Sequence, residues 1–125
     1  MKLGDTFLVR GGHLWVVSTL PAADGSVVMF NFTSLRNNYD NSCVIHAGEH
    51  PFIRHDTFVI YAQGKVVSLE MQKKMMANPA EAVPRQPVSG ELLERIQLGA
   101  LKSDFTPQKM QKAVQVSRAQ QQGAT

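Results

Sequence analysis

The densest group of polar side chains in the sequence lies between residues 40 and 55. Together with the histidine at position 13, this stretch holds every histidine of the chain, its single cysteine, two carboxylates and an arginine. The candidates are His13, Asp40, Cys43, His46, Glu49, His50, Arg54 and His55. Side chains of these types hold metal ions, move protons, or form turns and buried hydrogen bonds. Their spacing helps to separate these three hypotheses.

A metal site is the least favoured of the three hypotheses. Cys43, His46, His50 and His55 offer enough nitrogen and sulfur ligands for zinc. However, a Cys-x2-His pair followed by His-x4-His is not the spacing of a zinc finger or ribbon, and the glycine and proline between these residues disfavour a helix that would align them. We therefore expect no metal ion and no other cofactor.

Acid–base cleavage of RNA is the second hypothesis. This reaction needs a base for the 2′-hydroxyl, an acid for the leaving 5′-oxygen, and donors for the charge that develops on the phosphate. Histidine can carry either proton near neutral pH. Arg54 or Arg36 can hold a phosphate through two parallel hydrogen bonds, and the hydroxyls of Thr33 and Ser34 can donate to it. The composition permits this mechanism without specifying it.

The third hypothesis gives the same residues a structural role. A histidine at the start of a strand, such as His13, often bonds a neighbouring carbonyl, and Cys43 beside two apolar residues is typical of a small buried side chain. Asp40 follows two asparagines, as turn residues do, and Trp15 is expected in the core. Taken one at a time, these residues fit a structural role better than a catalytic one.

Short segments rich in β-branched and aromatic residues predict the elements that must position these side chains. Strands are expected at residues 7–9, 13–19, 26–33, 42–45, 57–61 and 65–68. Asp24-Gly25 predicts a hairpin turn, and Gln63-Gly64 predicts another turn. The apolar run in the third strand predicts burial on both faces. Closely spaced short strands predict a small barrel, which would leave no exposed sheet edge.

The C-terminal part of the sequence changes to helical character. Residues 69–77 are rich in good helix formers, residues 84–87 resemble a semi-rigid linker, and Ser89 is a suitable N-cap for a following helix. A last helix is expected after Pro107, with a disordered tail over residues 117–125. We therefore predict one mainly β domain with C-terminal helices (α+β), with a barrel over residues 1–70 and a helical extension over residues 71–125.

Composition and charge limit the classes of function. The 125-residue chain has no apolar run of the length that spans a bilayer and no apolar stretch of signal-peptide type at its start, and its single cysteine cannot form an internal disulfide, so a cytoplasmic location is expected. Residues 1–70 hold five Lys/Arg and six Asp/Glu, a net charge of −1, whereas residues 71–125 hold eight and four, a net charge of +4. A mildly basic half is compatible with an anionic polymer as a partner.

The order of several motifs resembles the PemK/MazF-like group of toxin proteins. These motifs are Gly4-Asp5 before the first strand, Val16-Val17-Ser18 in the second, and Thr33-Ser34 at the end of the third, followed by a later strand and a helix. The resemblance covers residues 3 to about 70. The segments 13–15, 31–34 and 48–53 indicate a divergent bacterial or phage-borne member rather than a standard toxin.

The resemblance implies an SH3-like small barrel and, in active members, metal-independent endoribonuclease activity on single-stranded RNA. Such proteins usually form homodimers and are neutralised by an antitoxin. The catalytic Thr or Ser of the family falls on Thr33 or Ser34, and its catalytic Arg falls at or beside His13. A permanently charged group is therefore replaced by one that can move a proton.

Together these arguments predict a specific set of site residues. His13 is expected to act as base or acid, Thr33 and Ser34 as hydroxyl donors, and His50 as the second proton carrier. The remaining members are Asp40 to orient a histidine, and Arg54 or Arg36 to hold the phosphate. The alternative is a non-enzymatic barrel module that binds a protein partner through its surface, with structural histidines.

Overall fold

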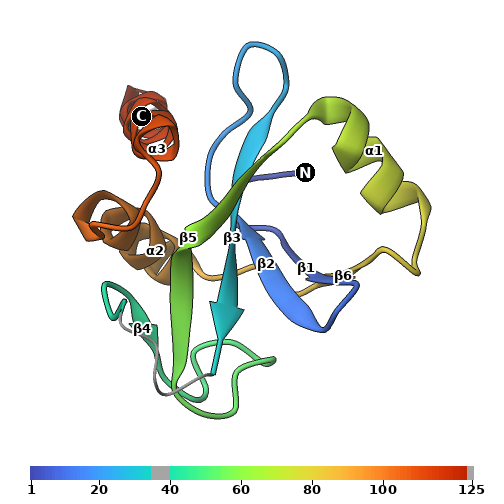
Figure 1. The fold of residues 1–125 in the computed structure, drawn as a ribbon, viewed down its shortest axis with the longest axis vertical. Coiled ribbons are helices and arrows are strands. Elements are labelled where there is room, and N and C mark those ends of the chain that lie inside the picture. The colour runs from blue at the N-terminus through green and yellow to red at the C-terminus, as the bar shows by residue number, and fades with distance from the viewer. Residues whose placement is uncertain (35–39, 124–125) are drawn as a thin grey trace.

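A computed structural model describes residues 1–34 and 40–123 and has an α+β fold (Figure 1). The strands are β1 (Thr6–Val9), β2 (His13–Val17), β3 (Val27–Thr33), β4 (Val44–Ile45), β5 (Thr57–Val67) and β6 (Ala82–Arg85). The helices are α1 (Leu69–Ala77), α2 (Gly90–Lys102) and α3 (Gln108–Gly123). The expected mixture of an N-terminal sheet and C-terminal helices is confirmed.

The six strands form one antiparallel sheet in the order β4-β5-β3-β2-β1-β6. Within the described residues β4 and β6 are its edges, so the expected closed barrel is instead an open, curled half-barrel. β4 has only two residues, and β6 contains Pro84, which has no N–H to donate. Short edges and edge prolines protect an open sheet from pairing with other chains.

The prediction of a turn at Gln63-Gly64 is wrong, because β5 continues through these residues as a single strand of 11 residues. Gly64 is needed for space rather than for a turn. A Cβ at this position would lie 2.6 Å from the ring of Phe30 and 2.8 Å from the sulfur of Met110. The glycine therefore allows the backbone of β5 to pack closely against Phe30 and Met110.

Residues 84 and 85, expected in a linker, belong to β6, which pairs with β1 from Thr6↔Arg85 to Val9↔Ala82. Residues beyond 70 therefore contribute a strand to the sheet as well as helices. Proline is found mainly in edge strands of a sheet, so Pro84 made this segment look like a linker in the sequence.

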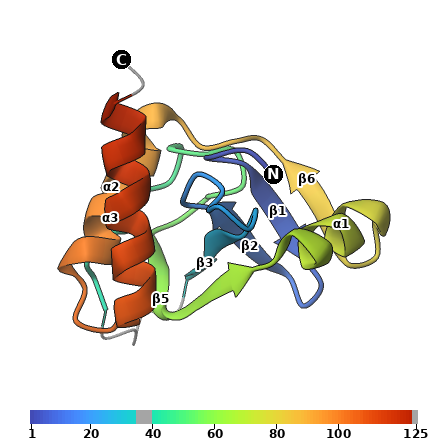
Figure 2. The same cartoon turned by 90° about the horizontal axis from the view of Figure 1, so that it is seen from above.

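Each face of the sheet is covered by different helices (Figure 2). One face packs on α2 and α3 in a core built around Phe30, Tyr61 and Ile96. The other face packs partly on α1 in a smaller core that includes Val17, Met29 and partly buried Met75. Because both of its faces are covered, β3 is buried along all seven residues, as its apolar run predicts.

The C-terminal helix is longer than expected. Ser89 caps α2 as predicted, with its hydroxyl accepting the N–H of Leu92 at 3.1 Å. The disordered tail expected from residue 117 is wrong, because α3 is helical to Gly123. Gln97 of α2 donates to Gln121 at 2.8 Å, and such buried polar contacts hold the end of α3 in place.

Of the described helices, none combines the length and apolar character needed to cross a membrane.

Replacing Gly64 by alanine should destabilise the fold by about 2 kcal/mol, because the added methyl group overpacks the core beside Phe30. Urea unfolding followed by circular dichroism measures the change. Gly90→Ala is the matched control, since nothing lies within 4 Å of a Cβ there, and it should cause no loss of stability. Equal stability of the Gly64→Ala variant and the wild type would contradict the packing described for β5.

Candidate functional site

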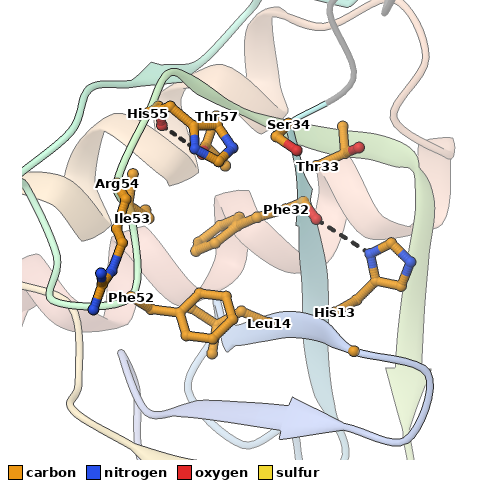
Figure 3. A pocket seen from close by; sticks show the side chains of 11 residues that line it. His13, Leu14, Phe32, Thr33, Ser34, Phe52, Ile53, Arg54, His55 and Thr57 are labelled. Carbon is orange, nitrogen blue, oxygen red and sulfur yellow. Dashed lines mark hydrogen bonds between the residues drawn. The ribbon is translucent and has the colours of Figure 1, made fainter.

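A cleft of about 370 Å³ lies at the end of the sheet where β2 begins and β3 ends (Figure 3). The loop that leads into β5 forms its other wall. The lining residues are Gly12, His13, Leu14, Phe32, Thr33, Ser34, Phe52, Ile53, Arg54, His55 and Thr57. Four residues predicted for the site, namely His13, Thr33, Ser34 and Arg54, therefore meet at one cleft.

Strand pairing places His13 and Thr33 next to each other. β2 and β3 pair as Trp15↔Asn31, and continuing this register by two residues brings His13 opposite Thr33. Directly opposed side chains on one face of an antiparallel pair have Cβ atoms about 5 Å apart. Figure 3 shows both side chains on the same side of β3. An imidazole and a hydroxyl are thus neighbours at the rim of the cleft.

The ring of His13 is exposed, and its Nδ1 lies 3.4 Å from the carbonyl oxygen of Phe32. A carbonyl only accepts, so this contact is a hydrogen bond when Nδ1 carries the proton. In that tautomer Nε2 is the proton acceptor of the ring. The contact therefore orients the imidazole, and the neutral Nδ1–H tautomer is the form that a general base requires.

The opposite side of β3 presents a second set of polar groups. Ser34 and Thr57 lie there with His55, above an apolar floor that includes Phe32 and Ile53 (Figure 3). Thr57 donates to the carbonyl of His55 at 2.9 Å, which fixes the chain just before β5. The cleft therefore has one histidine on each side of the strand end.

The charge of the cleft suits an anion. The described residues that line it include two histidines and an arginine, but no aspartate or glutamate. Arg54 is exposed on the loop wall, on the far side from His13, with its guanidinium directed away from the other labelled side chains. Phe52 projects beside it with 42% of its surface exposed. Cationic groups, hydroxyls and an open aromatic ring are the lining that a nucleotide needs.

His50 does not lie in this cleft. Its side chain is buried, with Nε2 in a short hydrogen bond to the carbonyl of Gln86 and Nδ1 accepting the N–H of Phe52 at 3.1 Å. These two contacts require the Nε2–H tautomer and use both ring nitrogens. His50 thus joins the loop to the segment after β6, and the expected second proton carrier is already engaged in structure.

Asp40 also lies elsewhere. It is buried and accepts hydrogen bonds of 2.7 Å from the hydroxyls of Ser42 and Ser103, so it connects the chain before β4 to the end of α2 rather than orienting a histidine. Arg36 lies outside the described residues. His46 is exposed, its Nδ1 lies 2.9 Å from a carboxylate oxygen of Asp56, and neither residue lines the cleft.

An ion pair between Arg95 and Glu49 fixes the loop that carries the cleft wall. Arg95 of α2 binds the carboxylate of Glu49 and donates to the carbonyl of Val44 at 2.6 Å. Glu49 in turn accepts the N–H of His46 at 2.7 Å. The hydrogen bond from Arg95 holds the pKa of the Glu49 carboxyl below its ordinary value. The loop is therefore anchored to α2 by a charged contact.

The described residues contain no group of three or more His, Cys, Asp or Glu side chains arranged to hold a metal ion. Cys43 is buried as expected, and burial raises the pKa of its thiol. A raised pKa disfavours the thiolate that would act as a nucleophile or ligand. The cleft therefore offers imidazole and hydroxyl chemistry rather than thiolate chemistry.

Sequence reasoning considered His55 only as a candidate metal ligand and left it out of the predicted cleavage site. The signal was available, since residues just before β5 must lie near the end of β3 when the two strands pair as Thr33↔Phe58. Phe52 carried no such signal, because its exposure depends on how His50 folds the loop.

The fold and the cleft define an α+β protein with an open half-barrel sheet and an anion-compatible cleft at one end of it. Comparisons with protein-family models, with curated proteins and with solved structures gave no match to this chain. The likeness to PemK/MazF-like toxins therefore rests on the motifs of the sequence.

Replacing Arg95 by methionine should lower the free energy of unfolding, and the loss should be larger at pH 7 than at pH 3. A lowered folded-state pKa of Glu49 contributes stability above its unfolded value of about 4.5, and this contribution disappears as the pH falls through the folded value. Urea unfolding of both proteins across this range measures it. A loss that does not depend on pH would contradict the charged anchor and leave only the bond to Val44.

Proposed function

We propose that this chain is a PemK/MazF-like protein that binds single-stranded RNA and cleaves it without a metal ion. The observation that carries the proposal is the pairing of β2 with β3, which sets an exposed imidazole beside a hydroxyl at an open cleft. The resemblance assigns the catalytic arginine of the family to a position at or beside His13, and its catalytic Thr or Ser to Thr33 or Ser34.

The proposed reaction begins with a proton transfer to His13. Nε2 takes the proton of the 2′-hydroxyl while the 2′-oxygen attacks phosphorus. The bond from phosphorus to the 2′-oxygen forms, and the bond to the 5′-oxygen breaks. The products are a 2′,3′-cyclic phosphate and a free 5′-hydroxyl. Donation from Thr33 and Ser34 to the non-bridging oxygens stabilises the additional negative charge.

The leaving 5′-oxygen needs a proton from the side opposite the base, because the entering and leaving oxygens lie nearly in line. His55 lies across the strand end from His13 and lines the same cleft. We therefore assign the role of general acid to His55 in place of His50. Arg54, on the same loop, holds a neighbouring phosphate, and the exposed ring of Phe52 stacks on a base.

Other parts of the proposal rest on the resemblance. Members of the family usually form homodimers and bind an antitoxin protein, and we propose the same partners here. The net charge of +4 over residues 71–125 supports retention of an anionic polymer. An RNA substrate also fits a cytoplasmic location.

A second candidate function is a non-enzymatic module that binds a protein partner. The observation that favours it is the exposure of large apolar side chains on or beside the C-terminal helices, with Leu98, Phe105 and Val116 each between 44% and 52% exposed. In that case the histidines at the cleft have structural roles only, and the purified chain cuts no RNA.

Purified protein should cleave single-stranded RNA in the presence of a chelator, and His13→Ala should lower the rate by at least about a hundredfold, the usual contribution of a general base or acid. Gel separation of end-labelled RNA measures the rate, and end-group analysis should find 2′,3′-cyclic phosphate and 5′-hydroxyl products.

The matched control is His46→Ala, which removes an exposed histidine outside the cleft and should leave the rate unchanged. Circular dichroism verifies that both variants are folded. Cleavage by the His13→Ala variant at the wild-type rate would rule out the mechanism. An absence of cleavage by the wild type would favour the interaction module.

A further inference from the structure

The sheet face that carries His13 continues towards α1 as a slot of about 230 Å³. The floor of the slot consists of Val9, Trp15 and Met29 from three strands, and α1 supplies Met71 and Met75 as its wall. Lys65 of β5 lies at the same slot. Figure 2 shows α1 alongside the edge of the sheet that holds β1 and β6. The slot is thus a largely apolar space between a helix and a sheet.

Strand pairing makes this slot continuous with the proposed catalytic cleft. Val9 pairs directly with His13, so a floor residue of the slot neighbours the proposed base. Trp15 lies two residues beyond His13 on the same face of β2. This separation is about 7 Å along a strand, a distance that one nucleotide can bridge. An RNA strand held at His13 therefore passes the mouth of the slot.

The lining of the slot suits a flat aromatic ring. Trp15 is only half-buried, so part of its indole is open for stacking. The thioethers of Met71 and Met75 are polarisable and make favourable contacts with aromatic rings. Stacking of a base on an aromatic side chain tolerates any sequence, because every base has a π-face. A slot of this size holds a single base rather than a helix or a strand.

A buried polar atom beside Trp15 lacks a partner. Asn31 is opposite Trp15 on the same face and is 97% buried, and its Oδ1 accepts no hydrogen bond in the described part of the chain. Its Nδ2 donates to Gln63 at 3.2 Å. An unsatisfied buried acceptor costs about 1–3 kcal/mol. Neither Asn31 nor Gln63 lines the slot, and Asn31 adjoins it only through its cross-strand pair with Trp15.

The charge at the slot favours the backbone of a nucleic acid. Glu81 lies at the slot, but its carboxylate is paired with Arg10 at 3.4 Å. No ion pair involves Lys65 among residues 1–34 and 40–123, so its ammonium group is available to a phosphate. The three charged groups together leave a net charge of +1 at the mouth.

We propose that this slot is a nucleobase subsite, which binds the base next to the scissile phosphate of a single-stranded RNA. The inference rests on the proposed function, since it needs an RNA strand at His13. The base stacks on Trp15 and against the α1 methionines, and Lys65 contacts the adjoining phosphate. The slot therefore contributes affinity, and His13 contributes chemistry.

Trp15 is the only tryptophan of the chain, so its fluorescence reports directly on the slot. The probe is a mixed-sequence, single-stranded RNA of seven nucleotides with 2′-O-methyl groups, which cannot be cleaved because the nucleophile is blocked. Titration of the full-length chain should quench the fluorescence saturably. Met71→Glu should weaken binding by about tenfold, as loss of one stacked base does. Lys65→Gln should reduce the dependence of binding on salt.

The matched control is Met76→Glu, which places the same charge on an exposed residue of α1 that does not line the slot and should bind as the wild type does. Equal affinities of the Met71→Glu and Met76→Glu variants, in a chain that still cleaves RNA through His13, would overturn the subsite alone. No binding and no cleavage by the wild type would overturn the proposed function as well. If Met71→Glu changes the oligomeric state of the chain in solution and leaves RNA binding unchanged, the subsite is overturned and the slot is identified as an interface between copies.

Discussion

The register of β3 between β2 and β5 is the constraint on which the rest of this molecule depends. Side chains alternate between the two faces of a strand, so a slip of one residue would move every side chain of β3 to the other face. The observed pairs, Trp15↔Asn31 and Thr33↔Phe58, are fixed because β3 is buried on both sides. This register puts Thr33 beside His13 and Asn31 beside Trp15. The proposed catalytic pair and the proposed base subsite are therefore consecutive rows of one sheet face.

The two faces of the sheet differ in how helices cover them. The larger core under α2 and α3 requires close backbone approach, and Gly64 and Gly99 provide it where a side chain would collide with Phe30 or Tyr61. Tyr61 donates to the carbonyl of Ile96 at 2.7 Å, which attaches β5 to α2. On the other face α1 covers only part of the sheet. The slot lies between α1 and this face, whereas the cleft lies at the end of the sheet and is lined by residues from both faces.

Much of the fold can be predicted from local sequence patterns. Where the prediction is wrong, the cause is a contact between residues that are distant in the sequence. The three N-terminal strands follow from β-branched runs, and the start of α2 follows from the cap at Ser89. In contrast, Gly64 has the local signature of a turn, and only the ring of Phe30 across the core explains why it lies in a strand. The polar sequence of α3 predicts disorder from residue 117, yet Gln97 holds it in a buried network 24 residues away.

In the candidate site, too, some positions follow from local sequence and others depend on distant contacts. His13 and Thr33 are at the ends of predictable strands, so the sequence can bring them together. His50 and His55 are both loop residues of the same chemical type, and no local pattern distinguishes the buried one from the one at the cleft. The carbonyl of Gln86, 36 residues further along the chain, decides this by bonding His50. Asp40 is likewise engaged by Ser103, which is distant in the sequence.

The most direct measurement of the central claim is a double-mutant cycle on RNA cleavage, with kcat/KM determined for the wild type, His13→Ala, Thr33→Val and the double variant. If the register makes these two side chains act on one phosphate, their effects are not additive, and the double variant is little worse than the more damaging single variant. Losses that multiply independently, or no loss in either single variant, would contradict the account.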